Sequence, residues 1–217
     1  MISSYNAQSG NVMVYLLLAL GLIGFLTFTL LRQNDQAGQQ DIDNEQLALY
    51  AQDLISYAHT AGSAVEMMEI QGSRLDQIDL TAPDQAAFNT GSPIHKLYHP
   101  QGGGLLYQAS LPSAISGTAA QWAMNNTINV EWTASTGTDI LLTAYDISRA
   151  VCSEINRYIL GNDTIPVTAN SHDNYFLDSG TTNLDATECS DCEGYSSLCV
   201  QDSSGGVFSY YTIIGAQ

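Results

Sequence analysis

The segment SGNVMVYLLLALGLIGFLTFTLLRQ, residues Ser9 to Gln33, decides how this chain is organised. Its apolar run from Val12 to Leu31 is twenty residues long and carries no charged side chain. As an α-helix, a run of this length extends about 30 Å, which matches the hydrocarbon core of a bilayer. The segment therefore predicts a transmembrane helix over residues 11–33.

A secretory signal peptide differs from this segment in its start, its length and its end. It begins with basic residues, has an apolar core of roughly 7–15 residues and is followed by a cleavage site of small residues. Here the first ten residues, MISSYNAQSG, contain no Lys or Arg, and the apolar run ends in Leu30-Leu31-Arg32-Gln33. The pattern therefore favours an apolar segment that stays on the mature protein.

A second helical pattern follows over residues 34–72. The polar, glycine-containing stretch from Gln33 to Gln40 predicts a hinge, and Asp43 with Gln46 has the spacing of a capping box. Apolar residues then recur at steps of three and four, which predicts an amphipathic helix that ends near Gln71-Gly72; they are Leu47, Tyr50, Leu54, Tyr57, Ala58, Ala61, Val65 and Met68. A small domain can cover the one apolar face of this second helix. The apolar segment over residues 11–33 has no polar face, so it requires lipid or other copies of itself as its surroundings.

Residues 73–217 predict one globular head that contains both strands and a short helix. The Gly102-Gly103-Gly104 run indicates a turn before a strand that starts at Leu105. Further strands are predicted over residues 127–133 and 140–144 and in the closing run GGVFSYYTIIGA. A helix over residues 147–160 is expected to be capped by Asp146 and ended by Gly161. These patterns predict an α+β fold with a small antiparallel sheet packed on the long N-terminal helix.

The chain is strongly acidic, with 22 Asp and Glu residues against five Lys and Arg residues and a formal net charge of −17. All the acidic residues lie beyond residue 33. This charge repels nucleic acid phosphates, so we expect no direct nucleic-acid binding. The simplest interpretation is a charge that keeps the head soluble.

The four cysteines, Cys152, Cys189, Cys192 and Cys199, all lie in the last third of the chain. An even number of cysteines beyond a membrane segment favours two disulfides in an oxidising compartment. A zinc site is the alternative, but the C-x2-C-x6-C spacing with a distant Cys152 fits neither a zinc finger nor a zinc ribbon. The spacing alone permits three disulfide pairings.

The segment from Asp163 to Gly194 is acidic and rich in Ser, Thr and Asn, which is typical of a solvated loop. Carboxylates on such a loop can also hold calcium, although their spacing here matches no EF-hand. The calcium candidates are Asp178, Asp185, Glu188 and Asp191. We expect no other metal or cofactor.

Signatures of catalysis are not found in the sequence. It contains neither G-x-S-x-G nor H-E-x-x-H, and the three consecutive glycines lack the Lys and Ser or Thr of a phosphate-binding loop. His95 and His99 lie between Pro93 and Pro100, which favours loop residues over a helical metal pair. We therefore expect a protein that is not an enzyme.

The order of these features resembles type IV pilins and pseudopilins, and more narrowly a group of alphaproteobacterial pilin-like proteins. The resemblance covers nearly the whole chain; it is carried by GNVMVYLLLALGLIGFLT, LALYAQDLISYAHTAGSAVEMMEIQG, LYHPQGGGLLY, AVCSEINRYILG and CVQDSSGGVFSYYTIIGA. It implies a pilin-like fold, with a long helix and a disulfide-tied C-terminal region. It also implies a structural subunit of a pilus-like or secretion-like extracellular filament.

The resemblance also implies how such a subunit matures and assembles. A prepilin peptidase would cut between Gly10 and Asn11, so residues 1–10 would be a leader and the helix would remain. The precursor would sit in the inner membrane, and an assembly platform there would pack its N-terminal helix against other copies or other pilins. In the resembling proteins a cysteine after the short helix pairs with one before the last strand, which implies Cys152 with Cys199 and leaves Cys189 with Cys192.

One departure from that family supports a different function. Major pilins carry an acidic residue shortly after the cut, and Tyr15 occupies that place here. The leader also lacks basic residues. The alternative is a periplasmic binding or sensing domain that is anchored in the inner membrane and does not polymerise.

Overall fold

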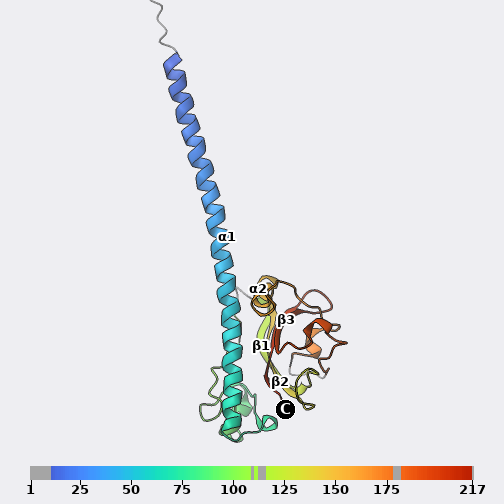
Figure 1. Cartoon of the computed structure of the whole chain (residues 1–217). Helices are drawn as coiled ribbons and strands as arrows, with labels where there is room; N and C mark the ends of the chain where they lie inside the picture. The colour runs from blue at the N-terminus through green and yellow to red at the C-terminus, as the bar shows by residue number, and fades with distance from the viewer. Residues whose placement is uncertain (1–10, 109, 112–115, 178–181, 217) are drawn as a thin grey trace, which may run out of the picture. The chain divides into compact units, whose positions relative to one another are not determined.

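The computed structural model describes residues 11–108, 110–111, 116–177 and 182–216, with side chains described only in part over residues 11–44 and not over 116–119. Contacts within the chain divide it into two units, residues 1–46 and 47–217. The helices are α1 (Asn11–Ile70) and α2 (Arg149–Leu160), and the strands are β1 (Ser116–Ile128), β2 (Asp139–Ile147), β3 (Ser197–Gln201) and β4 (Phe208–Gly215). The predicted α+β class is confirmed (Figure 1).

Helix α1 is 60 residues long and has no break at the predicted hinge. Residues 33–40 and the predicted cap at Asp43 lie inside the helix, so both predictions were wrong. Gln, Asn and Asp are only mildly unfavourable in a helix and a single Gly costs about 1 kcal/mol, so a polar stretch need not end one. The predicted end is confirmed: Gly72 has φ 98°, and the Ser73 amide donates to the Met68 carbonyl at 2.9 Å.

The membrane prediction falls mostly outside the part of the chain that can test it. Among the residues whose side chains are described, no helix is long and apolar enough to cross a membrane. Most side chains of residues 11–33 lie outside the described residues. The transmembrane assignment therefore stays a prediction.

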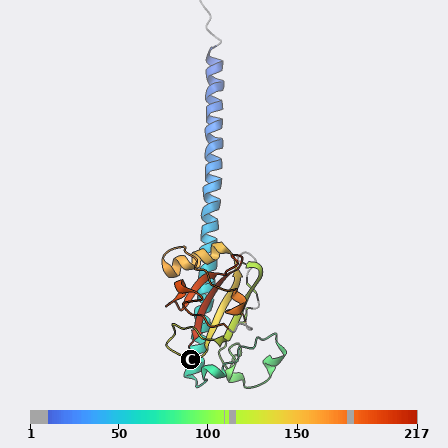
Figure 2. The same ribbon diagram turned by 90° about the vertical axis from the view of Figure 1, so that its right-hand side faces the viewer.

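The four strands form one antiparallel sheet in the order β1-β2-β4-β3. Strand β2 is central and pairs Ala144 with Trp122 of β1. Its other side pairs Leu142 with Thr212 of β4. Strands β1 and β3 are thus the two edges, which are visible in Figure 2. The small antiparallel sheet is as the sequence predicted.

The sheet buries both of its faces because alternate residues of the central strands are apolar on each side. One face packs on the 51–68 portion of α1, and this cluster includes Leu54, Val65 and Met68 of α1 with Leu142 and Ala144 of β2. The predicted apolar stripe of α1 therefore does contact the sheet. The opposite face, with Leu141, Leu198 and Tyr211, is covered by the loop region around Tyr175, Phe176 and Leu184.

Several strand boundaries differ from those predicted. Residues 105–107 are not a strand; the Leu105 amide instead donates to the Leu97 carbonyl at 3.0 Å. The strand predicted over residues 127–133 ends at Ile128 and extends backwards to Ser116, through the polar run Asn125-Asn126-Thr127 that hid the pattern. Strand β2 was predicted correctly but runs longer, and β3 was not predicted.

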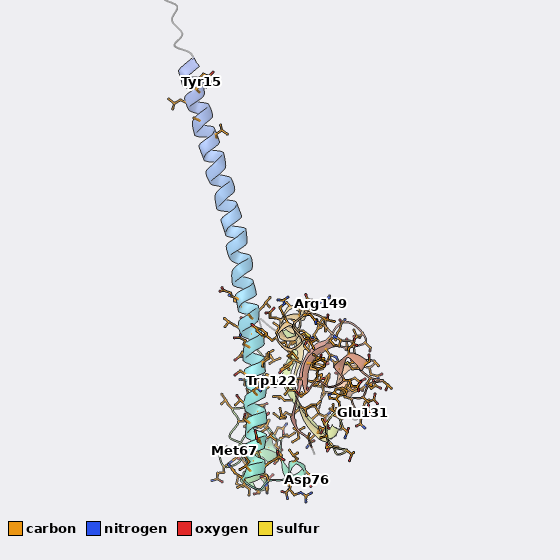
Figure 3. All side chains as sticks on the ribbon, viewed as in Figure 1. Tyr15, Met67, Asp76, Trp122, Glu131 and Arg149 are labelled. Atoms are coloured by element: carbon orange, nitrogen blue, oxygen red, sulfur yellow. A yellow bond between two sulfur atoms is a disulfide. The ribbon has the colours of Figure 1, made fainter. Side chains whose placement is uncertain are left out.

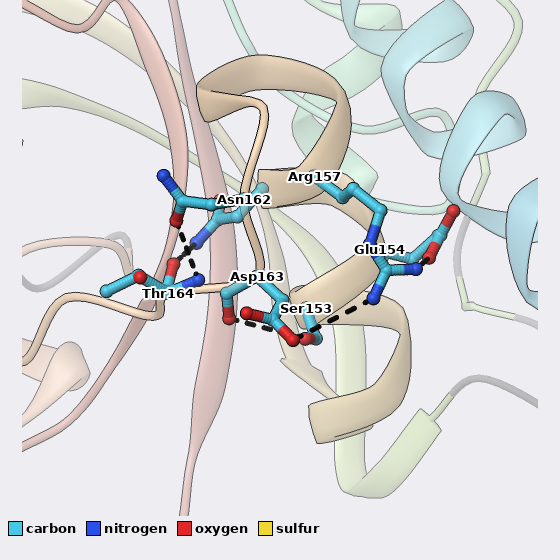
Figure 4. Close-up of polar contacts among 7 residues, drawn as sticks. Ser153, Glu154, Arg157, Asn162, Asp163 and Thr164 are labelled. Carbon is cyan, nitrogen blue, oxygen red and sulfur yellow. Dashed lines mark hydrogen bonds and ion pairs between the residues drawn. The ribbon is translucent and has the colours of Figure 1, made fainter.

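The cap of α2 was assigned to the wrong residue. Asp146 lies in β2 with φ 55°, and Ser148 is the N-cap, whose Oγ accepts from the Val151 amide at 3.3 Å. The predicted end is confirmed by Gly161, which has φ 74°. In the last turn of α2, Arg157 is paired with Glu154 at 2.5 Å and with Asp163 at 3.8 Å, as Figure 4 shows.

The three-glycine run forms a turn, as predicted, and it wraps closely around the backbone of residues 96–97. A Cβ on Gly102 would lie 2.2 Å from the Lys96 carbonyl oxygen and 2.8 Å from that of Pro93. A Cβ on Gly103 would lie 2.6 Å from the Leu97 carbonyl oxygen. Only glycine fits at both positions because the neighbouring atoms belong to the backbone.

We expect Gly102→Ala to lower the free energy of unfolding by about 2 kcal/mol, since the methyl group forces the backbone apart. Urea unfolding followed by tryptophan fluorescence measures this change. Gly104→Ala is the matched control: its φ is 62° but its Cβ meets open space, so we expect a loss of about 1 kcal/mol. A larger loss for Gly104→Ala than for Gly102→Ala would contradict the prediction.

Candidate functional site

A disulfide and a buried amide tie α2 to the edge strand β3. Cys152 is joined to Cys199, with both side chains fully buried and Cα atoms 5.4 Å apart. One turn later, Asn156 donates to the Cys199 carbonyl at 2.7 Å and accepts from the Cys199 amide at 2.8 Å. Sequence reasoning missed Asn156, although it lies four residues after Cys152 and therefore on the same side of α2. The disulfide and the hydrogen bonds of the Asn156 amide therefore both join α2 to β3 at Cys199.

The second disulfide lies within the loop region that covers the far face of the sheet. Cys189 and Cys192 are bonded across a short 3-10 turn, and both are buried in the cluster around Tyr175. The two disulfides together use all four cysteines. This is the pairing that the pilin resemblance implies.

The calcium candidates that the structure describes, Asp185, Glu188 and Asp191, do not form a metal site. Asp185 accepts hydrogen bonds from the amides of Thr187 and Glu188 at 2.8 and 3.0 Å, and these bonds and that from the Thr187 hydroxyl lower its pKa. Glu188 accepts from Tyr175 and, at 2.7 Å, from Asn170. Asp191 is exposed, and Asp178 lies outside the described residues. Within the described chain, no group of three His, Cys, Asp or Glu residues is arranged to hold a metal ion.

A fully buried histidine lies beneath this loop region. His172 Nδ1 is 2.8 Å from the Ser209 hydroxyl of β4, and the ring packs edge-on against Phe176 with centroids 5.1 Å apart. Its Nε2 has no hydrogen-bond partner among the described atoms. Burial lowers the pKa of His172 to about 4, although the carboxylates of Asp202 and Asp173 act in the opposite direction. The ring is therefore neutral at pH 7, and the sequence did not single it out.

A concave surface of the described chain borders residues 121–126 of β1, and we call it the β1 groove. It has a volume of about 660 Å³, within the range of ligand pockets. One wall is formed by residues 121–126 of β1 and the other by residues 78–82, with Tyr98 and Tyr107 also in the lining. Figure 3 shows Trp122 of this wall beside α1, where its ring lies 4.7 Å from that of Tyr57.

The only charged residue among the described lining residues of the β1 groove is Asp79. Asp79 is paired with the buried Lys96 at 2.5 Å. Burial alone would raise the pKa of Asp79, but hydrogen bonds from Lys96 and Thr81 outweigh it and hold the pKa below its ordinary value. The exposed Asp84 accepts from the hydroxyl of Tyr107, a lining residue, at 3.2 Å. No Lys or Arg is among the described lining residues.

The remaining candidate positions lie near the start of the chain and in the loop before β1. Gly10, with the whole predicted leader, lies outside the described residues, and Asn11, the first described residue, lies in α1. His95 Nδ1 is 2.9 Å from the Ser73 hydroxyl, and His99 Nδ1 accepts from the Gln101 amide at 3.1 Å. Each histidine therefore makes a hydrogen bond to a residue outside any strand, and the two lie in a loop as predicted.

Comparison of this chain with protein-family models, curated proteins and solved structures found no match. The resemblance to pilins therefore rests on the residues that carry it.

Proposed function

We propose that this protein is a structural subunit, a major or minor pilin or pseudopilin, of an extracellular filament of the type IV pilus or type II secretion kind. The observation that carries the proposal is helix α1, which runs without a break from Asn11, the first described residue, to Ile70. Its residues 12–31 form an uncharged, largely apolar run in sequence, and its 51–68 portion packs on the sheet. One helix thus combines a segment for assembly with a segment that supports the head.

In this proposal, residues 11–33 anchor the precursor in the inner membrane and later pack against other subunits in the filament core. The transfer is energetically possible because apolar area that leaves lipid for a helical core stays away from water. Apolar side chains on the later part of α1 support such contacts. Leu49, Met67 and Ile70 are 64 %, 51 % and 74 % exposed, so the chain's own sheet does not cover them.

The partners of the proposed subunit are those of the assembly pathway. They are a prepilin peptidase acting between Gly10 and Asn11, an inner-membrane assembly platform, and other pilins. We propose no catalytic role and no nucleic-acid ligand for the head. The two disulfides and the buried clusters serve to hold the head together outside the cell.

Tyr15 supports a second candidate function. Its side chain is 66 % exposed, and it occupies the place of the acidic residue that resembling major pilins carry after the cut. A subunit without that carboxylate lacks the charge that pairs with a neighbour's new amino group. The alternative is therefore an uncut, membrane-anchored periplasmic binding or sensing domain.

The test is the N-terminal sequence and intact mass of the protein purified from its native host. We expect a chain that begins at Asn11, because the peptidase would remove the leader, and filaments by electron microscopy. Gly10→Leu should block the cut and leave the full-length chain, since a large side chain replaces the glycine at the cleaved bond. Ser9→Ala is the matched control and should still be cut. A wild-type chain that begins at Met1 would overturn the proposal and favour the anchored domain.

A further inference from the structure

We propose that the β1 groove binds an extended peptide segment with basic side chains, and that this segment pairs with β1 as a fifth strand of the sheet. The proposal concerns the head alone and does not depend on whether the protein polymerises. It is carried by the position of the groove along a strand edge and by the charge of its lining.

The groove follows the backbone edge of β1 and is not restricted to one face of the strand. Successive side chains of a strand point to opposite faces, so a pocket on one face is lined by alternate residues. Here six consecutive residues, 121–126, line the groove. The shared boundary is therefore the backbone edge between the two faces.

Strand β1 pairs with β2 on one side, and no other strand of the described chain pairs with its outer side. An edge strand presents N–H and C=O groups of alternate residues outward, which is the template that strand addition uses. Six residues at 3.3 Å each extend about 20 Å, enough for a peptide of five or six residues.

The opposite wall and one end of the groove are held in place by their own hydrogen bonds. The Asp79 amide donates to the His95 carbonyl at 2.8 Å, and the Leu97 amide donates to the Asp79 carbonyl at 3.0 Å. At the end of the groove, the Asn125 side chain donates to the carbonyls of Tyr175 and Leu177 at 3.0 and 3.1 Å. A peptide would thus enter a groove with positioned walls, which lowers the entropic cost of binding.

The lining selects the side chains of the peptide. Tyr98, Tyr107 and Trp122 supply aromatic surface, with the two tyrosine rings 5.1 Å apart in a T-shaped arrangement. The carboxylate of Asp79 is already paired with Lys96, so the unneutralised charge nearby is the exposed carboxylate of Asp84, which accepts from Tyr107. Lys96 offers no repulsion because it is only 2 % exposed and its charge is paired. In a chain of net charge −17, these features favour alternating apolar and basic residues in the partner.

The experiment titrates the full-length chain, purified in a mild detergent, into fluorescein-labelled acetyl-(Val-Lys)4-amide and follows fluorescence polarisation. We expect saturable binding that weakens as salt is added. The same peptide should slow hydrogen exchange of the β1 amides in residues 121–124. The control peptide acetyl-(Pro-Lys)4-amide has the same charge but cannot pair as a strand, so it should not bind.

Two variants with equal charge changes test the location. Gln121 lines the groove and is exposed, so Gln121→Lys should weaken binding about fivefold through repulsion of the basic peptide. Ser203 is exposed in the turn between β3 and β4, and Ser203→Lys should leave the affinity unchanged. Any of three results would overturn the proposal: no binding of the Val-Lys peptide at millimolar concentration, equal binding of the Pro-Lys peptide, or equal loss in both variants.

Discussion

Replacing both Cys152 and Cys199 by Ala should lower the free energy of unfolding by about 4 kcal/mol, the largest effect that we expect from the removal of one contact. The disulfide joins residues 47 positions apart, so its loss returns the entropy of a long loop to the unfolded chain. Ala keeps the fully buried site apolar, which separates the loss of the crosslink from the burial of a new polar group. The amide of Asn156 remains and keeps α2 in contact with β3.

The Cys189→Ala/Cys192→Ala double variant is the matched control. It removes the same number of sulfur atoms, but the two cysteines are only three positions apart, so we expect a loss of about 2 kcal/mol. Urea unfolding of the two variants and of the parent, each with and without reductant, gives the comparison. Equal losses in the two variants would show that buried volume dominates over loop entropy and would contradict the prediction.

Acidification from pH 6.5 to pH 4 should lower the free energy of unfolding by about 3 kcal/mol through His172 alone. The pKa of this buried ring is lowered to about 4 in the folded chain, whereas an unfolded histidine has a pKa near 6.5. Between these two values the unfolded chain binds the proton and the folded chain does not. Stability from this group is therefore complete above pH 6.5 and is lost as the pH falls toward 4.

The variant His172→Asn tests this pH dependence. Asn cannot titrate, and its amide can keep the contact that Nδ1 makes with Ser209, so we expect a flatter stability profile between pH 6.5 and 4.5. The exposed His59→Asn on α1 is the control and should retain the slope of the parent. Below pH 4 the profiles should run closer to parallel, because Asp79 and Asp185, whose pKa values are lowered, take up protons there in both proteins. An unchanged slope in His172→Asn would contradict the prediction.

Apolar residues that recur at steps of three and four were the most reliable guide to the fold. The stripe from Leu47 to Met68 correctly indicated which face of α1 meets the sheet, because a helix repeats its face through its own geometry. Glycines were equally informative where the backbone requires them, as at Gly72 and Gly161. Strand boundaries were harder, because β1 contains a run of polar residues that tertiary contacts hold in the sheet.

Asn125 illustrates why tertiary contacts could not be read from the pattern. Asn is disfavoured in strands, yet its side chain is buried and donates to two carbonyls of a segment fifty residues away. The same holds for Asp146, which local reasoning placed as a helix cap and which the structure places in β2. The secondary structure of such a residue depends on contacts with residues that are distant in sequence. A single sequence does not show which residues these are.

The sequence by itself determined the α+β class of the fold, the buried face of the helix from Leu47 to Met68, the strongly acidic head and the resemblance to pilins. These follow from composition and from periodicities that each segment carries locally. Only the tertiary structure decided the burial of His172, the amide of Asn156 beside the Cys152–Cys199 disulfide, and the β1 groove. Each of these depends on contacts between segments that lie about 35 to 50 residues apart in the sequence. Such segments come into contact only when the chain has folded and packed.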